Sequence, residues 1–386
     1  MADTYIPRLL RPPDQSFFLF GPRGAGKSTW VGYEIPGAHR IDLLDEARYQ
    51  SYLSRVGLFA DELRALPRGA PVVVDEIQRL PHLLNEVHRF IEERRLRFVL
   101  CGSSARKLKQ QGTNLLAGRA LRRHLHPFVP QELGRAFDLD AALSVGTLPV
   151  IWQAASRREA LVAYVQLYLR EEVQAEALVR NLPGFARFLP IAALFHAQTL
   201  NVAGLSRDAE VSRTTVTGYL DIIEDTLLAF RLPAFEARMR VRERRHPKLY
   251  WVDAGIVRAL KRQLGAPAAE EQGALFEGWI ANLCRIHNDY RELFDEWYYW
   301  APAEAARTEV DFVLRRGRES VALEAKAGTR VGADDLRGLR AIDGLTGLKR
   351  RVLVYRGARR LTTSDGIEVW PVDRFLEVLA ADRLWP

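Results

Sequence analysis

One motif constrains this chain more than any other feature. Residues 21–28 read GPRGAGKS and match the phosphate-binding pattern G-x-x-x-x-G-K-[ST] in full. The apolar run at residues 17–20 predicts a strand before it, and a helical pattern begins near Lys27. A glycine-rich turn between strand and helix lets backbone N–H groups surround a phosphate at the helix N-terminus. The alternative, a chance glycine-rich turn, is disfavoured by this strand and helix.

The motif predicts ATP and Mg²⁺ as cofactors. Lys27 would reach the β- and γ-phosphates, and Ser28 would hold Mg²⁺. The candidate nucleotide-binding residues are Gly21, Pro22, Arg23, Gly24, Ala25, Gly26, Lys27, Ser28 and Thr29.

The second half of such a site is predicted where the apolar run Val72-Val-Val74 ends in Asp75 and Glu76. Asp75 would position Mg²⁺ through water, and Glu76 would polarise the water that attacks the γ-phosphate. The alternative is an acidic pair that caps the helix expected to open at Pro81.

Two further residues are candidates for the same chemistry. Ser103 or Ser104, after the apolar run at residues 97–101, would orient water beside the γ-phosphate, and Ser103 is favoured. The alternative, which concerns Ser104 above all, is the N-cap of a helix over residues 105–111. Arg119 would stabilise the transferring phosphoryl group of a neighbouring subunit, with Arg122 or Arg123 behind it. The alternative for Arg119 is a solvated or salt-bridged arginine.

Residues 202–230 predict a helix, a turn and a second helix, with Ser212 as the N-cap of the second. An apolar strand and a basic stretch follow, which together indicate a winged helix. Arg213 would meet phosphates or base edges at the start of the recognition helix. We predict DNA contacts for Arg213, Arg238, Arg240, Arg242, Arg244 and Lys248. The alternative is that this segment docks proteins.

Carboxylates gather near the C-terminus. Asp311 lies in one predicted strand, and Glu324 and Lys326 lie on the same side of the next. A hairpin would bring the three together, the carboxylates would bind Mg²⁺, and Lys326 would orient water. Glu277, on the preceding helix, would add a metal ligand. This order of elements resembles the PD-(D/E)xK nuclease core. The alternative is a set of cross-strand salt bridges.

Composition and pattern divide the 386 residues into three regions. Residues 1–150 alternate buried-strand and helix patterns, which predicts an α/β P-loop NTPase domain with a parallel sheet. Residues 151–264 predict a helical lid and winged-helix domain, and residues 265–386 an α/β restriction-endonuclease-like domain. The net charge of +8 favours polyanionic partners only modestly. Two cysteines, no secretory signal and no membrane-length apolar run favour a cytoplasmic protein.

The motifs together resemble the prokaryotic AAA-type (AAA+) ATPases whose C-terminal domain has been described only as of unknown function. The resemblance is carried by GPRGAGKST from residue 21, VDEIQ from 74, CGSS from 101, LAGR from 116, YLDIIEDTLL from 219, PKLYWVDAG from 247, GALFE from 273 and EVDF from 309. It implies an ATPase domain, a winged helix, a nuclease-like domain and a homo-oligomer, with a hexameric ring as one form.

The sequence therefore predicts an ATP-hydrolysing motor that translocates or remodels branched or duplex DNA in repair or recombination, with a C-terminal Mg²⁺-dependent nuclease-like module. The alternative is an ATP-gated signalling or assembly switch, or a defence effector, whose C-terminal domains bind protein rather than cut DNA.

Overall fold

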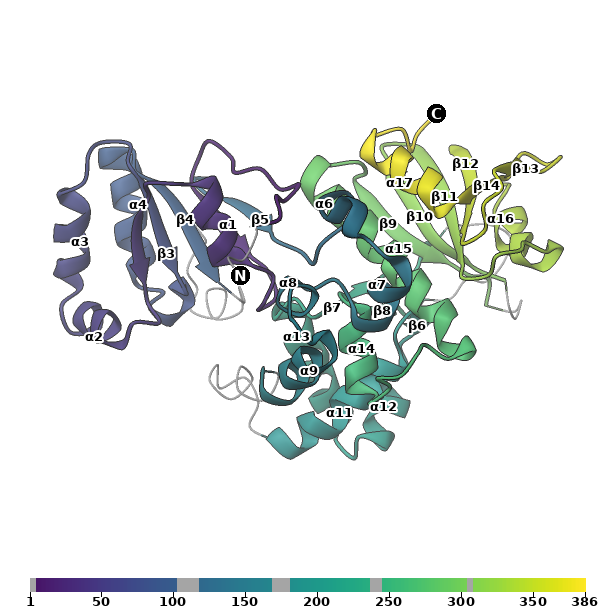
Figure 1. The fold of residues 1–386 in the computed structure, drawn as a ribbon, viewed down its shortest axis with the longest axis horizontal. Helices are drawn as coiled ribbons and strands as arrows, with labels where there is room; N and C mark the ends of the chain where they lie inside the picture. Colours follow the sequence, from purple (N-terminus) through teal and green to yellow (C-terminus); the bar gives the residue numbers. More distant parts are fainter. Residues whose placement is uncertain (1–4, 103–117, 169–180, 237–244, 304–307) are drawn as a thin grey trace. The chain divides into compact units, whose positions relative to one another are not determined.

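A computed structural model describes residues 5–102, 118–168, 181–236, 245–303 and 308–386 (Figure 1). The chain divides into two compact units. The first comprises Met1–Phe128, Leu148–Val150 and Asp225–Leu228, and the second comprises Val129–Thr147, Ile151–Glu224 and Ala229–Pro386. The predicted middle and C-terminal regions thus share most of one compact unit, and the boundaries at 150 and 264 stay predictions.

The first unit contains a five-stranded sheet in the order β2-β3-β4-β1-β5, and every neighbouring pair is parallel. The strands are β1 (Phe17–Phe20), β2 (His39–Asp42), β3 (Pro71–Asp75), β4 (Arg97–Gly102) and β5 (Leu121–His124). The predicted parallel α/β sheet is therefore confirmed. Because all strands run the same way, their carboxyl ends meet at one edge, where ligands of open α/β sheets bind.

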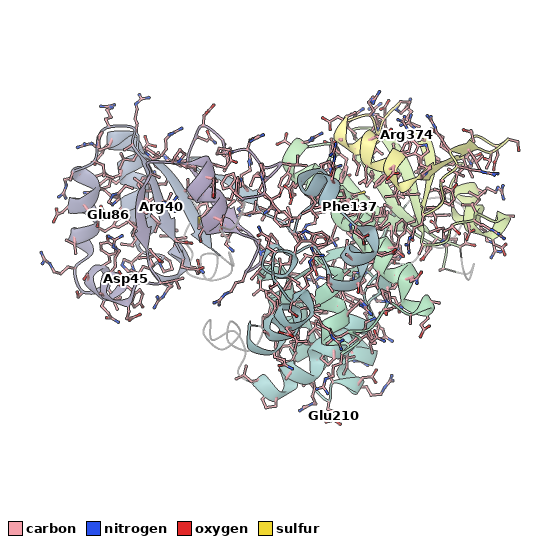
Figure 2. The ribbon with its side chains drawn as sticks, viewed as in Figure 1. Arg40, Asp45, Glu86, Phe137, Glu210 and Arg374 are labelled. Atoms are coloured by element: carbon pink, nitrogen blue, oxygen red, sulfur yellow. The ribbon has the colours of Figure 1, made fainter. Side chains whose placement is uncertain are left out.

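Helices connect these strands, namely α1 (Lys27–Glu34), α2 (Glu46–Ser54), α3 (Val56–Arg64), the 3-10 helix η1 (Ile77–Arg79) and α4 (Leu83–Arg94). Asp45, labelled in Figure 2, caps α2 by accepting hydrogen bonds from Ala47 N and Arg48 N. Alternate strand residues such as Phe18, Val72 and Leu100 pack into one buried cluster with helix side chains. This core fixes the edge at which the phosphate-binding loop lies.

The described residues between 129 and 264 form mainly helices. The helices are α6 (Pro130–Leu133), η2 (Gly134–Ala136), α7 (Leu139–Val145), α8 (Pro149–Trp152), α9 (Arg157–Ala163), the π-helix η3 (Tyr164–Tyr168), α11 (Leu182–Leu194), α12 (Val202–Asp208), α13 (Arg213–Asp225) and α14 (Ala254–Leu260). This region also contains a small antiparallel sheet in the order β6-β8-β7. Strand β6 (Gln198–Thr199) precedes α12, and β7 (Ala229–Leu232) and β8 (Lys248–Trp251) follow α13.

The C-terminal part begins with the long helix α15 (Ala269–Arg291) and continues into a six-stranded sheet in the order β13-β14-β12-β11-β10-β9. The strands are β9 (Glu296–Trp300), β10 (Val310–Arg316), β11 (Glu319–Lys326), β12 (Leu348–Tyr355), β13 (Leu361–Thr362) and β14 (Glu368–Pro371). The predicted hairpin is present, since β10 and β11 pair antiparallel, whereas β11, β12 and β14 are parallel. Short helices η4 (Ala333–Leu336), α16 (Arg337–Ala341) and α17 (Val372–Ala380) complete it.

No helix among the described residues is long and apolar enough to cross a membrane.

Candidate functional site

The phosphate-binding loop joins β1 to α1 in the first unit. Gly24 and Gly26 have φ values of 75° and 84°, a left-handed conformation that side chains with a Cβ rarely adopt. Gly26 is also the N-cap of α1. Left-handed residues in such a turn direct successive backbone N–H groups into one concavity, which attracts anions. The backbone of the loop therefore fits a phosphate.

Lys27 and Ser28 make contacts consistent with their predicted roles. The Nζ atom of Lys27, which is 9% exposed, donates to the carbonyl of Gly21 at 2.7 Å and so lies along the inner side of the loop. The hydroxyl of Ser28 donates to Oδ2 of Asp75 at 2.9 Å. A hydroxyl and a carboxylate that meet here are oxygen ligands of the kind that Mg²⁺ takes in nucleotide sites. Ser28 and Asp75 therefore fit the predicted ion.

Arg8 donates hydrogen bonds to the backbone of this loop and of the segment after β5. This role was not predicted from the sequence. The guanidinium of Arg8 is 4% exposed and donates to the carbonyl of Ala25 at 2.9 Å and to the carbonyl of His126. No spacing rule links a residue so near the N-terminus to the loop, and only the fold brings the two together.

The predicted catalytic acid, Glu76, directly follows β3 and has a left-handed backbone (φ 55°, ψ 42°). Its Oε2 accepts a hydrogen bond from Nε2 of Gln78, a residue that is 4% exposed. Such strain in a non-glycine residue is concentrated at functional sites. Gln78 was missed by sequence reasoning, although it lies within the VDEIQ motif.

Strand β4 lies between β1 and β3. Neighbouring strands are about 4.8 Å apart, so the loop strand and the acid strand are separated by about 10 Å. The end of β4 therefore lies between the loop and the acids. Ser103 follows Gly102, where β4 ends, but it lies outside the described residues, and its role stays a prediction.

Arg119 lies away from the loop of its own chain. It precedes β5, whose Leu121 pairs with Phe17 at the start of β1, whereas the loop follows Phe20 at the end of β1. Arg119 is therefore at the amino edge of the sheet, where its Nε contacts Oε1 of Glu92 at 2.5 Å. In this position it cannot reach the nucleotide of its own subunit.

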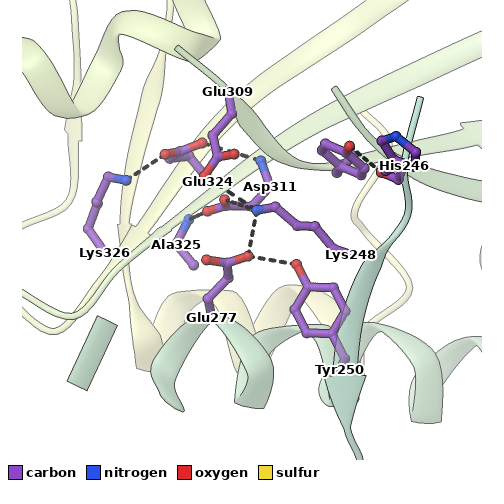
Figure 3. A network of polar contacts seen from close by, with 10 residues as sticks. His246, Lys248, Tyr250, Glu277, Glu309, Asp311, Glu324, Ala325 and Lys326 are labelled. Carbon is purple, nitrogen blue, oxygen red and sulfur yellow. Dashed lines mark hydrogen bonds and ion pairs between the residues drawn. The ribbon is translucent and has the colours of Figure 1, made fainter. Parts of the chain in front are cut away.

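A second cluster of polar groups lies in the second unit, between α15 and the hairpin of β10 and β11 (Figure 3). Oδ2 of Asp311 accepts from the backbone N–H of Ala325 at 2.9 Å, and Nζ of Lys326 donates to Oε1 of Glu324 at 2.6 Å. Asp311 and Glu324 are buried. The structure therefore brings together Asp311, Glu324 and Lys326, as the hairpin predicted.

Lys248 extends from β8 into the middle of this cluster. Its Nζ is 2.9 Å from Oε1 of Glu277, 3.3 Å from Oε1 of Glu309 and 3.4 Å from Oδ1 of Asp311. Only 2% of Lys248 is exposed, so its prediction as a DNA contact is wrong. The sequence offered one signal against that prediction, because Lys248 begins the apolar strand KLYW.

Burial and charge shift the proton affinities in this cluster. Burial and the nearby charge of Asp311 raise the pKa of Glu277 to about 7, against the effect of Lys248. Burial, followed by the charge of Asp311, raises the pKa of Glu324. Burial alone would lower the pKa of Lys248, but the charges around it, led by Glu277, raise it overall.

The predicted metal ligands Glu277, Asp311 and Glu324 are gathered, but their arrangement does not fit a divalent ion. The ammonium of Lys248 stands among the oxygens that would bind it, and Tyr250 donates its hydroxyl to Oε1 of Glu277 at 2.6 Å. Magnesium requires several oxygens at about 2.1 Å and keeps some of its waters. A buried lysine in that place leaves no position for the ion.

The remaining DNA-contact candidates divide into two groups. Arg213 begins α13 and is exposed, and Ser212 caps this helix as predicted, with its Oγ accepting from Thr215 N at 3.1 Å. The other candidates, Arg238, Arg240, Arg242 and Arg244, lie outside the described residues.

Comparison with protein families divides the chain into three matched segments. Residues 13–134 match a family described as an AAA domain. Residues 136–268 and 272–375 match two families that are each described as a domain of unknown function, DUF8612 and DUF4143. With the loop and the acids described above, the first match identifies residues 13–134 as an ATP-binding, AAA-type ATPase domain.

The chain is also similar to whole proteins. The "Uncharacterized protein Rv2008c" of Mycobacterium tuberculosis is 26% identical over 376 residues, which cover 95% of this chain and 82% of that protein. "Uncharacterized protein Mb2031c" of Mycobacterium bovis matches to the same extent. These relatives share the length of the chain, not only its ATPase segment.

Similarity to solved structures is slight. The Aeropyrum pernix ORC1 protein in complex with DNA has a TM-score of 0.30 and 15% identity, and the match covers 64% of this chain and 86% of that one. Replication initiator DnaA bound to AMPPCP and single-stranded DNA has a TM-score of 0.30 and 13% identity, with coverages of 56% and 83%. Scores this low have no bearing on function.

Proposed function

We propose that this AAA-type ATPase is a DNA-acting motor that hydrolyses Mg²⁺-ATP at the carboxyl edge of its parallel sheet. The contact between Ser28 and Asp75 carries the ATPase part of the proposal, because it joins the loop to the acid strand. Lys27 and the loop amides hold the phosphates, and Ser28 and Asp75 hold the ion. Magnesium, when bound, neutralises charge on the phosphate oxygens.

Glu76 has the position of the catalytic base in this proposal. The amide of Gln78 donates to Oε2 of Glu76 and holds this carboxylate where β3 ends, two strands away from the loop strand β1. From there Glu76 accepts the proton of the attacking water.

The DNA part of the proposal is supported by the outward face of α13. Arg213, Thr214 and Thr217 are exposed on the first turns of this helix, and a Cβ added at Gly218 would meet nothing within 4 Å. The opposite face, with Val216 and residues further along, is buried. A 13-residue helix with such a face, preceded by α12 and a short turn, suits docking into a major groove.

The strands after α13 fit a winged helix. β7 and β8 are antiparallel neighbours, and the four arginines Arg238, Arg240, Arg242 and Arg244 fall between them in the sequence. A basic connection between two strands of a wing is suited to phosphate contacts.

Binding of fluorescent duplex and single-stranded DNA at several salt concentrations tests this proposal. We expect the binding constant to fall steeply with salt, and Arg213→Gln to reduce the slope of log K against log salt by about 1. Arg337→Gln, which removes an exposed arginine of α16, is the control and should leave the slope unchanged. We also expect DNA to increase the ATPase rate. Absence of DNA binding, or binding insensitive to salt, would contradict the DNA-acting role.

A second candidate function is an ATP-gated switch whose C-terminal domain binds a partner. One observation favours it, namely the lysine that fills the carboxylate cluster. A Mg²⁺-dependent nuclease of Asp311, Glu324 and Lys326 remains a prediction from the sequence, and the position of Lys248 counts against it. An ATPase rate that protein, but not DNA, increases would favour the switch.

A further inference from the structure

We propose that Lys248 is the resident cation of the C-terminal carboxylate cluster, so that this site excludes divalent metal ions and ties β8 to α15 and β10 without them. The inference concerns the second unit alone and does not depend on the ATPase proposal.

The position of the ammonium carries the proposal. Its three carboxylate contacts, at 2.9, 3.3 and 3.4 Å, come from Glu277 on α15, Glu309 just before β10 and Asp311 within β10. Two of these residues, Glu277 and Asp311, are among the metal ligands that the sequence predicts for a nuclease-like site. Lys248 and Asp311 are each 2% exposed, so the ammonium is enclosed rather than lying at a solvent-facing rim.

The strand that carries Lys248 fixes this position. All four residues of β8 are buried, and side chains two apart in a strand point the same way. Lys248 and Tyr250 therefore both point toward Glu277, whose Oε1 accepts from each. The ring of Tyr299 lies 5.5 Å from Nζ of Lys248, within the range of a cation–π contact. If this lysine turned outward, Glu277 and Asp311 would keep their hydrogen bonds from Tyr250 and Ala325 but would lose the cation between them.

Charge balance gives the lysine its role. Four carboxylates meet in this cluster, those of Glu277, Glu309, Asp311 and Glu324, and the ammonium groups beside them belong to Lys248 and Lys326. Lys326 is 34% exposed and pairs with Glu324 at the rim. Without Lys248 the inner carboxylates would lack a cation, and buried charges need a partner. A divalent ion could then take its place.

Binding of Mn²⁺ to the full-length, nucleotide-free protein tests the proposal, with electron paramagnetic resonance to count bound ions. We expect wild type and Asp311→Asn to give the same titration, because the cluster binds no ion in either. Loss of a bound Mn²⁺ in Asp311→Asn would overturn the proposal. This comparison does not require any Lys248 variant to fold.

The complementary experiment removes the lysine. We expect Lys248→Met to bind one more Mn²⁺ than wild type, and the double variant Lys248→Met/Asp311→Asn to lose that ion. Lys326→Met, which removes a lysine from the rim, is the matched control and should gain none. Thermal unfolding gives a second readout, since Mn²⁺ should raise the Tm of Lys248→Met by several degrees more than that of wild type. A folded Lys248→Met protein that gains neither the ion nor the shift would contradict the proposal.

Discussion

The backbone of Glu76 stores strain at the residue proposed as the catalytic base. A left-handed conformation costs a residue with a Cβ roughly 1 kcal/mol, and glycine avoids that cost. Glu76→Gly also removes the carboxylate that accepts from buried Gln78, a loss that offsets the relief of strain. We therefore expect Glu76→Gly to keep a Tm close to that of wild type while ATP hydrolysis falls at least about 100-fold. Thermal unfolding and phosphate release measure the two effects on one preparation.

Arg95 provides the control for that substitution. It has a similar left-handed backbone (φ 53°), caps α4 in the same unit and is exposed. Arg95→Gly relieves the strain at an exposed residue and should raise the Tm slightly and leave hydrolysis unchanged. If Glu76→Gly keeps wild-type hydrolysis, Glu76 is not the base.

Buried His196 makes the second unit sensitive to acid. Burial, followed by the charge of Lys261, lowers the pKa of His196 from its usual 6.5 to about 3, and Nδ1 accepts a hydrogen bond from Trp251 N at 3.1 Å. Between these two pKa values the unfolded chain binds the proton and the folded chain does not. Stability should therefore fall as the pH drops below about 6.5, by up to about 1.4 kcal/mol per pH unit from this residue.

Substitution by asparagine isolates that contribution. His196→Asn keeps an acceptor for Trp251 N–H and removes the titrating ring. Urea unfolding at several pH values between 4 and 7 should show a shallower loss of stability in the variant. Identical slopes in the two proteins would show that His196 does not carry the acid sensitivity.

At the scale of single elements, Asp253 joins two helices. Its Oδ1 accepts from Ile256 N and caps α14, and its Oδ2 accepts from Thr147 N, just after α7, at 2.7 Å. Asp253 is 3% exposed. Asp253→Ala would remove a cap, worth about 1 kcal/mol, and leave a buried N–H unpaired, which costs about 1–3 kcal/mol.

We therefore expect Asp253→Ala to lower the free energy of unfolding of the second unit by about 2–4 kcal/mol in urea titrations. The control is Asp45→Ala, which removes an exposed cap from α2 and should cost about 1 kcal/mol. Equal losses for the two variants would contradict the joining role of Asp253.

Local patterns were sufficient to predict much of this fold. The run before Gly21 gave β1, the glycine spacing gave the loop, and the alternation around Asp311 and Glu324 gave the hairpin. Each of these depends on residues close together in the sequence.

Long-range contacts were beyond such patterns. Arg8 reaches the loop, and Lys248 reaches the C-terminal carboxylates, only because the fold brings distant segments together. In the sequence analysis Lys248 was grouped with the arginines before it, because together they form a basic stretch suited to phosphate contacts. The short strand β14 was not predicted from the sequence. Its four residues form a strand through their parallel pairing with β12, a contact that a local pattern does not indicate.

At the scale of the whole molecule, the predicted role of Arg119 requires a homo-oligomer. Arg119 lies at the opposite edge of the sheet from its own loop, so we propose that it acts on the nucleotide of a neighbouring subunit in a homo-oligomer. Lys27→Ala and Arg119→Ala should each be inactive alone. A mixture of the two should regain part of the ATPase rate, because the Lys27→Ala subunit supplies Arg119 to an intact loop.

Subunit exchange must be verified for that mixture by light scattering or labelled subunits. Exchange without any recovery of hydrolysis would rule out action of Arg119 across subunits. A wild-type rate of ATP hydrolysis in Arg119→Ala would show that Arg119 is a structural residue that pairs with Glu92.

The central claim is that the loop and β3 together bind and hydrolyse Mg²⁺-ATP. The most direct test measures ATP binding and phosphate release by wild type, Lys27→Ala and Glu76→Gln in the presence of Mg²⁺. We predict that wild type hydrolyses ATP, that Lys27→Ala loses binding, and that Glu76→Gln binds ATP within a few-fold of wild type while its hydrolysis falls at least about 100-fold. A wild-type chain without affinity for ATP, or a Glu76→Gln variant with an unchanged rate, would contradict the claim.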